Sequence, residues 1–269
     1  MTPFRRQILL LLLILAGVAM SSCEEILDAE GLPYEEKLVI HGILFAESSS
    51  SVIQISRTLP LNIPFDTNQA FLATATGSIS DGEKTYPLEY LGYSGKYRAA
   101  GLIPQSGRSY SLNVSSGEFT ATATTTVPPV SKVDTAFITI ESSRFGYEQY
   151  LVTCKMLLPE AASVQIQTMV KGDGTPIYTS DHRLYSENSS EDDGYLYTKT
   201  SLYKSEDQTI TGVWVRHYTF APGYYEYHQS RRGDDFEELG NPAVVRWNVA
   251  GDAIGIFFGC AIGESTINF

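Results

Sequence analysis

Short runs of β-branched and aromatic residues, separated by Gly, Pro, Asn and Ser, fill residues 37–127 and restrict the fold more than any other feature. Such runs are typical of strands that bury one face and end at turns. The dipeptides Asp81-Gly82 and Ser116-Gly117 favour hairpin closure between runs. The expected strands are 37–45, 52–58, 73–80, 85–91, 96–99, 109–114 and 119–126. Seven short strands over about ninety residues predict an immunoglobulin-like β-sandwich over 37–127.

A second β region follows two consecutive prolines, Pro128 and Pro129. Neither can donate to a strand ladder, so we expect a domain boundary there and a second, mainly antiparallel β domain over 130–269. Residues 178–194 are polar and acidic without a clear period, which predicts a long loop. Aromatic residues at three- and four-residue steps predict one short helix over 222–232. The remaining expected strands are 133–141, 150–158, 163–171, 195–203, 212–219, 243–248 and 253–261. The predicted fold class is all-β.

The first 22 residues have the layout of a bacterial lipoprotein signal peptide. Two arginines precede an apolar run, and the run ends at Met20-Ser21-Ser22-Cys23. The apolar run spans about 13 residues, too short for a helix that needs about 20 to cross a bilayer. We expect cleavage before Cys23 and acylation of its thiol, although Met20 stands where Leu is usual. Several acyl chains, such as palmitate, would make the anchor effectively permanent. Residues 23–36 then form an acidic tether.

The composition limits the partners of the folded part. The chain of 269 residues has a formal net charge of −12, which makes nucleic acid a poor partner. After acylation of Cys23, two of the three cysteines remain, Cys154 and Cys260. Each shares its strand face with apolar residues, so both side chains should point inward. They could pair as a disulfide or stay as buried free thiols, and no cysteine spacing resembles a zinc site.

Catalytic motifs do not stand out from the sequence. The four histidines, His41, His182, His217 and His228, lie on separate elements, which favours structural roles. No nucleophile elbow, phosphate-binding glycine loop or His-Glu-x-x-His pair occurs. The acidic clusters 191–193 and 234–238 lack the spacing of a calcium loop, so solvated loops are favoured. We therefore expect no enzyme, no cofactor and no metal. A hydrolase that uses a carboxylate pair stays open, because only the fold sets the separation of such a pair.

Tyrosine is the residue type most suggestive of binding. Seventeen tyrosines occur, and many flank the expected loop or lie on the expected helix. Tyrosine suits recognition surfaces because it gives rigid amphipathic contact area, but strands also favour it for ordinary packing. Both interpretations stay open. The candidate binding residues are Tyr185, Tyr195, Tyr197, Tyr224, Tyr225 and Tyr227.

Four segments together resemble a known family. Near the C-terminus, Asn248-Val249-Ala250-Gly251 and Gly255-Ile256-Phe257 are similar to the closing signature of a Bacteroidetes lipoprotein family, domain of unknown function 4249. Trp247 and Asp252 depart from that signature, where the family has Ser and Gly. Upstream, 37–42 resembles the first strand of the family, 107–114 its Gly-x-x-Tyr-x-Leu-x-Val strand, and 225–230 its short helix.

The resemblance implies an outer-membrane lipoprotein, often encoded beside TonB-dependent receptors, with no established activity and no catalytic residues to carry over. With the acidic tether, it favours a lipid-anchored protein at the cell exterior that binds an unknown glycan or peptide, or that assists such a receptor. The alternatives are a surface hydrolase and a structural or assembly factor of the envelope.

Overall fold

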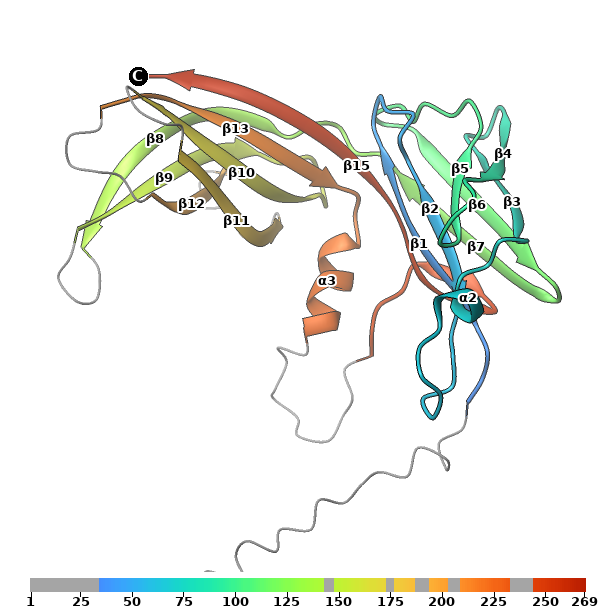
Figure 1. Cartoon of the computed structure of the whole chain (residues 1–269). Helices are drawn as coiled ribbons and strands as arrows, with labels where there is room; N and C mark the ends of the chain where they lie inside the picture. Colours follow the sequence, from blue (N-terminus) through green and yellow to red (C-terminus); the bar gives the residue numbers. More distant parts are fainter. Residues whose placement is uncertain (1–33, 143–147, 173–176, 187–193, 203–208, 233–243) are drawn as a thin grey trace, which may run out of the picture. The chain divides into compact units, whose positions relative to one another are not determined.

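The structure, a computed structural model, describes residues 34–142, 148–172, 177–186, 194–202, 209–232 and 244–269 (Figure 1). Cys23, the expected signal peptide and most of the expected tether lie outside these ranges. Contacts divide the chain into two units, Met1–Glu35 with Pro60–Pro64, and Glu36–Leu59 with Phe65–Phe269. All described strands belong to the second unit. Within the described ranges, no helix combines the length and apolarity needed to span a bilayer.

The first sandwich is built by seven strands, the short strand β14 and the first half of β15. Its strands bury alternate residues, as in β1, where Leu38, Ile40 and Leu44 point inward. The bounds are β1 Leu38–Phe45, β2 Ile53–Arg57, β3 Thr76–Ser80, β4 Thr85–Tyr90, β5 Lys96–Ala99, β6 Ser109–Ser116, β7 Phe119–Thr126 and β14 Val249–Gly251, with the one-turn helix α2 at Thr67–Ala70. Their inward residues form one continuous core. Burial of this core is the main stabilising contribution.

The second sandwich packs a three-stranded sheet, β12-β9-β8, against the strands β11-β10-β13-β15. Its bounds are β8 Lys132–Ser142, β9 Glu148–Leu157, β10 Ser163–Gly172, β11 Ile177–Ser186, β12 Leu196–Leu202, β13 Ile210–Phe220 and β15 Ala253–Asn268. A separate apolar core lies between the two sheets, with Val152 and Ile166 fully buried. The helix α3, Tyr224–Arg232, follows β13.

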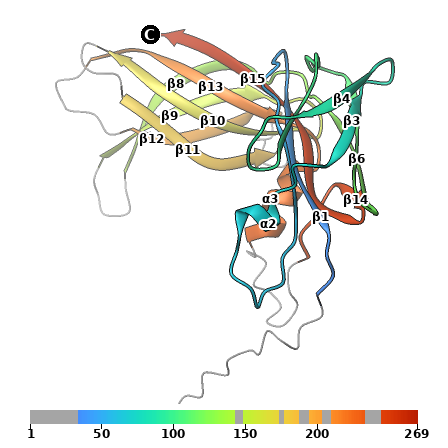
Figure 2. The same ribbon diagram turned by 45° about the vertical axis from the view of Figure 1, so that its right-hand side comes forward.

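The strand β15 belongs to both sandwiches (Figure 1, Figure 2). Residues Ala253 to Cys260 pair in parallel with β1, and Cys260 to Asn268 pair antiparallel with β13. A single 12-stranded sheet therefore runs through the chain in the order β11-β10-β13-β15-β1-β2-β5-β4-β3-β6-β7-β14. Val249, Ala253 and Phe257 pack in the first core, although their position in the sequence led us to expect them in the second domain.

The all-β class and the single short helix on the C-terminal side are confirmed, and several element bounds differ from expectation. The predicted loop 178–194 is wrong in its first part, where β11 extends to Ser186; 187–193 lie outside the described residues. The predicted strand 243–248 is also wrong, because 244–248 form no strand and β14 begins at Val249. Cys154 and Cys260 are free and buried, so the disulfide alternative is not formed.

Gly255 allows β15 to pass close to β1. Its φ is 129°, which L side chains rarely adopt, and a Cβ there would overlap the carbonyl oxygen of Ile40. We expect Gly255→Ala to lower the free energy of unfolding by about 3 kcal/mol or more, because strain and steric overlap add. Gly82→Ala is the control, since Gly82 also has positive φ but opens to solvent; it should cost only about 1 kcal/mol. Equal losses in urea denaturation would contradict this role for Gly255.

His217 of β13 is 1% exposed at the place where the linker after Pro129 meets the second sandwich. The Thr219 hydroxyl donates to Ser131 Oγ over 2.8 Å, and the Ser131 N–H donates back to Thr219 Oγ1 over 3.0 Å. Beside this pair the imidazole lies against Gly263, where a Cβ would overlap the ring. Burial lowers the pKa of His217 from 6.5 to about 4. The folded protein therefore holds this imidazole neutral.

This depressed pKa makes the stability depend on pH. Below pH 6.5 the unfolded chain takes up a proton that the folded chain does not bind until about pH 4. Stability should therefore fall as the pH drops through this window, by up to about 3 kcal/mol from this group, and level off below it. His217→Gln should remove that part of the slope in urea denaturation at pH 4 to 7. His41, whose pKa burial also lowers, would leave a residual slope of the same sign. An unchanged slope in the variant would refute the assignment.

Candidate functional site

The segment from Val245 to Asn248 is fixed to β15 by one side chain. The Asn248 amide donates to the Phe257 carbonyl over 2.6 Å and accepts from the Phe257 N–H over 2.7 Å. The Asn248 N–H also donates to the carbonyl of Gly255 over 3.3 Å. This pairing holds Arg246 and Trp247 beside the first half of β15, outside any regular ladder. Trp247 remains 40% exposed.

The helix α3 packs on the same stretch of β15 through aromatic rings. Tyr224 stacks on Phe220 with centroids 4.1 Å apart and meets Phe258 edge-on at 5.4 Å. One turn later, Tyr227 lies 6.3 Å from Phe258 and 5.7 Å from Trp247. Aromatic pairs of this geometry contribute about 0.5–1.5 kcal/mol each beyond their buried area. The inner face of the helix is therefore held firmly, and burial raises the pKa of Tyr224.

One hydrogen bond connects the C-terminal part of α3 to the Trp247 segment, and a second, within α3, orients the Ser230 hydroxyl that accepts it. The Arg246 N–H donates to Ser230 Oγ over 3.0 Å, and the Ser230 hydroxyl donates to the Tyr227 carbonyl over 2.8 Å. The Arg231 guanidinium lies 5.5 Å from the centre of the Tyr227 ring and donates to its hydroxyl. The helix and the Trp247 segment thus form one packed assembly on β15.

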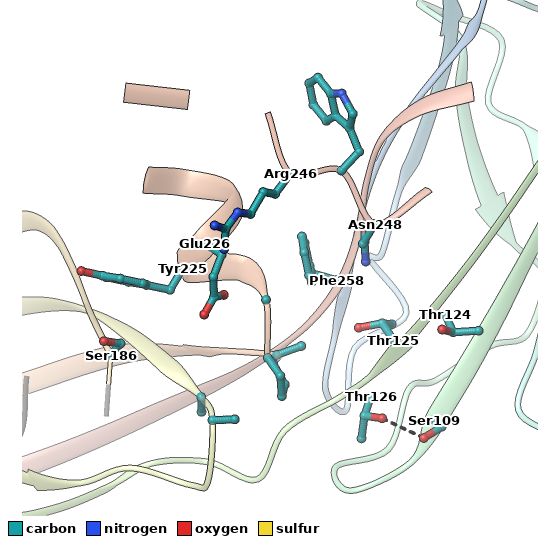
Figure 3. A pocket seen from close by; sticks show the side chains of 16 residues that line it. Ser109, Thr124, Thr125, Thr126, Ser186, Tyr225, Glu226, Arg246, Asn248 and Phe258 are labelled. Atoms are coloured by element: carbon teal, nitrogen blue, oxygen red, sulfur yellow. Dashed lines mark hydrogen bonds between the residues drawn. The ribbon is translucent and has the colours of Figure 1, made fainter. Parts of the chain in front are cut away.

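Beside this assembly lies a cleft of about 640 Å³. Figure 3 shows its lining side chains, which come from strands, from loops and from the first turn of α3. The lining residues are Ser109, Thr124, Thr125, Thr126, Ala161, Ala162, Ser186, Ala221, Pro222, Gly223, Tyr225, Glu226, Arg246, Trp247, Asn248 and Phe258. A volume of this size falls in the range of small-ligand sites, about 300–1,000 Å³.

One wall of the cleft is rich in hydroxyl groups. Ser109 and Thr126 share a hydrogen bond of 2.8 Å, which Figure 3 marks, and Thr124 lies one residue along β7 from the buried Thr125. Thr125 Oγ1 accepts from the Gly259 N–H over 2.8 Å, which ties β7 to β15. A hydroxyl both donates and accepts, so the Ser109–Thr126 pair retains capacity for a ligand.

Aromatic and charged groups form the opposite wall. Tyr225 and Glu226 stand on the first turn of α3, and Arg246 and Trp247 stand on the segment that Asn248 holds. Glu226 and Arg246 are exposed, and Tyr225 is half-buried. The cleft therefore offers ring faces, one cation, one carboxylate and a row of hydroxyls. This combination suits a polar ligand that also has apolar faces.

The tyrosines proposed from the sequence do not form one surface. Only Tyr225 lines the cleft, while Tyr224 and Tyr227 pack α3 onto β15. On β12 and the residue before it, Tyr197 and Tyr195 flank the Lys155 ammonium, with ring centres 5.6 and 3.9 Å away. Tyr185 packs partly against the second core. The sequence interpretation did not assign Arg246, Trp247, Asn248 or the hydroxyl wall to a site. The signal was the closing signature, which contains Asn248 and in which Trp247 stands where the family has Ser.

The described lining offers hydroxyl groups but no imidazole or thiol. It contains neither His nor Cys, and Glu226 supplies its single carboxylate, whereas glycoside hydrolysis needs two. Burial raises the pKa of both Cys154 and Cys260 to about 12, which makes these thiols unreactive. Within the described ranges, no cluster of His, Cys, Asp and Glu could hold a metal ion. The acidic clusters 191–193 and 234–238 and the His182 side chain lie outside them.

Fold and cleft together define a class of protein: two β-sandwiches that share one long strand, with a ligand-sized cleft beside that strand. The chain belongs to the family described as domain of unknown function DUF4249, whose model matches residues 24–266. No curated protein matches the chain.

The geometry gives Asn248 a testable structural role in the cleft. Asn248→Ala leaves two backbone groups of Phe257 without their partner, so unfolding should become easier by about 2–3 kcal/mol. In a Trp214→Phe background, the emission of Trp247 should also shift to the red as its segment loosens. Asn268→Ala, which truncates an exposed Asn at the end of β15, should change stability by less than about 0.5 kcal/mol. If Asn248→Ala behaved like this control, the segment would be held by other contacts.

Proposed function

We propose that this protein is a lipid-anchored lipoprotein on the outer face of the outer membrane, which binds a glycan or peptide in the cleft beside β15. It acts without catalysis, as the accessory partner of a TonB-dependent receptor. The single observation that supports ligand binding most strongly is the cleft itself, of about 640 Å³. The Cys23 motif and the acidic tether support the anchor and its outward display. The receptor partnership rests on the family resemblance.

The cleft walls favour these two ligand classes over others. Sugars and peptides both present hydrogen-bonding groups along one edge and apolar C–H faces along another. The hydroxyls of Ser109, Thr124 and Thr126 match the first, and the rings of Tyr225 and Trp247 match the second. Nucleotides and other strongly anionic ligands fit less well, because Arg246 is the one cation among the described lining residues. The net charge of −12 disfavours them further.

Substitution of Trp247 is the sharpest test of ligand binding in the cleft, because the second tryptophan of the chain, Trp214, serves as a matched control outside the cleft. Oligosaccharide and peptide panels are screened against the wild type by calorimetry, and the tightest binder is kept as the probe. Trp247→Ala should weaken its binding by about 10- to 100-fold, the loss typical of an aromatic anchor. Trp214→Ala is the matched control: its ring lies on β13 beside the Arg216 guanidinium, 5.0 Å away, and does not line the cleft.

Three outcomes would overturn the proposal. Equal weakening by both substitutions would place binding outside the cleft. If no oligosaccharide or peptide of either panel bound, the proposed ligand binding would be wrong. If the full lipidated protein were purified from mildly solubilised native membranes and no outer-membrane receptor co-purified with it, the proposed partnership would be wrong.

A further inference from the structure

An apolar loop connects β2 to α2. We define it as residues 59–66, which read Leu-Pro-Leu-Asn-Ile-Pro-Phe-Asp. Leu61 is 79% exposed, Phe65 is 70% exposed and Ile63 is 39% exposed. Neighbouring apolar side chains exposed to this degree are unfavourable in water and mark a surface that meets another phase or molecule.

Both ends of this loop are firmly rooted in the first sandwich. On the outgoing side, the Thr58 N–H donates to the Lys37 carbonyl over 2.9 Å, and the Lys37 N–H donates to Thr58 Oγ1 over 3.0 Å. On the returning side, Phe71 bridges to Ser56, and the Leu72 N–H donates to the carbonyl of Ile55 over 3.2 Å. The loop therefore starts and ends against the same stretch of β2.

Local contacts also order the returning half of the loop. The Asp66 side chain accepts from the Asn68 N–H over 2.9 Å and caps α2, whose Ala70 is buried. The Phe65 ring meets Phe71 edge-on, with centroids 6.4 Å apart. Pro60 and Pro64 fix φ on either side of Ile63. The residues at both ends of the loop are therefore well packed, so poor packing there does not explain why the apolar side chains are exposed.

The root of the loop coincides with the point where the tether enters the sandwich. The tether that starts at Cys23 ends directly before Lys37, the residue that is hydrogen-bonded to Thr58. The strand pairing then continues with Leu38 opposite Arg57. The Arg57 guanidinium also forms an ion pair of 3.0 Å with Glu36. The 14 residues from Cys23 to Glu36 span at most about 50 Å when fully extended. An acylated Cys23 therefore keeps the root of the loop within this distance of the lipid surface.

We propose that the apolar loop inserts Leu61, Ile63 and Phe65 into the lipid leaflet that holds the acyl chains of Cys23, as a second contact with the membrane. The inference rests on the lipid anchor of the proposed function. Residues 59–66 contain no Lys or Arg, so attraction to anionic headgroups is not the source of binding. Apolar burial drives the insertion, and the contact should therefore be insensitive to salt.

The test places an environment-sensitive dye on the loop of the full lipidated protein. Leu61→Cys is labelled with a nitrobenzoxadiazole dye, and the protein is reconstituted in vesicles of phosphatidylethanolamine and phosphatidylglycerol without any other protein. Cys154 and Cys260 are buried with pKa values of about 12 and should not react. Ile103→Cys is the matched control, an aliphatic side chain that is 52% exposed on another loop. Position 61 should show blue-shifted emission and quenching by nitroxide lipids, and position 103 should show neither.

A second arm tests the loop without the anchor. The mature chain with Cys23→Ala is mixed with the same vesicles, and sedimentation measures its partitioning. Leu61→Asp in that chain should lower the partition coefficient about tenfold or more, whereas Ile103→Asp should leave it unchanged. Substitution of these exposed side chains does not disturb either core, so a folding defect would not mimic the result.

The outcomes separate the loop from the anchor. If Cys23 is acylated and the protein stays on vesicles while position 61 remains in water, the inference fails and the anchor stands. If Cys23 is not acylated but the loop still partitions in the second arm, the loop contact stands and the anchor of the proposed function fails. Protection of position 61 in native membranes but not in protein-free vesicles would indicate a protein partner and would overturn the inference.

Discussion

The double pairing of β15 is the constraint on which the rest of the structure depends. Its first half closes the first sandwich through β1, and its second half closes the second sandwich through β13. Cys260 takes part in both ladders, opposite Phe45 and opposite Phe220. Because one strand contributes to both cores, a destabilising substitution near Cys260 should lower the stability of both sandwiches. The close passage at Gly255 lies within the same strand.

The cleft is a consequence of this change of partner. β15 pairs with β1 in its first half and with β13 in its second half. At the point of change, the segment after β13 turns away from β15 at Ala221 to Gly223, immediately before α3. The end of β7 approaches from the other side, because Thr125 accepts from the Gly259 N–H. Phe258 lies between these walls and also supports α3. The scaffold and the groups that line the cleft thus meet at one point of one strand, which is the usual arrangement of loops positioned by a rigid framework.

The expected strands of residues 37–127 lie close to β1 to β7 because these strands alternate between buried and exposed residues, as β1 and β6 show. The sequence interpretation missed β11, whose run Ser180-Asp181-His182-Arg183 is polar. An edge strand of the large sheet tolerates such a run. It also missed the cleft, because Asn248 is fixed by backbone groups of Phe257, and Thr125 by Gly259 at a separation of 134 residues. The Thr125 pairing depends on the tertiary fold and leaves no local pattern, and the closing signature that holds Asn248 and Phe257 does not reveal their hydrogen bonds.

The distribution of tyrosines shows why residue counts alone do not locate a binding surface. Tyr224 and Tyr227 resemble Tyr225 in sequence context, yet their rings fix α3 to Phe258, while Tyr225 turns to the cleft. The packed pair shapes the cleft in an indirect way. A helix held by stacked rings presents Tyr225 and Glu226 in a fixed position, and the Tyr227 ring contacts the Trp247 ring. Preorganisation of this kind lowers the entropic cost of binding in general, so in the proposed function the packed tyrosines would favour a tighter complex at the exposed rings.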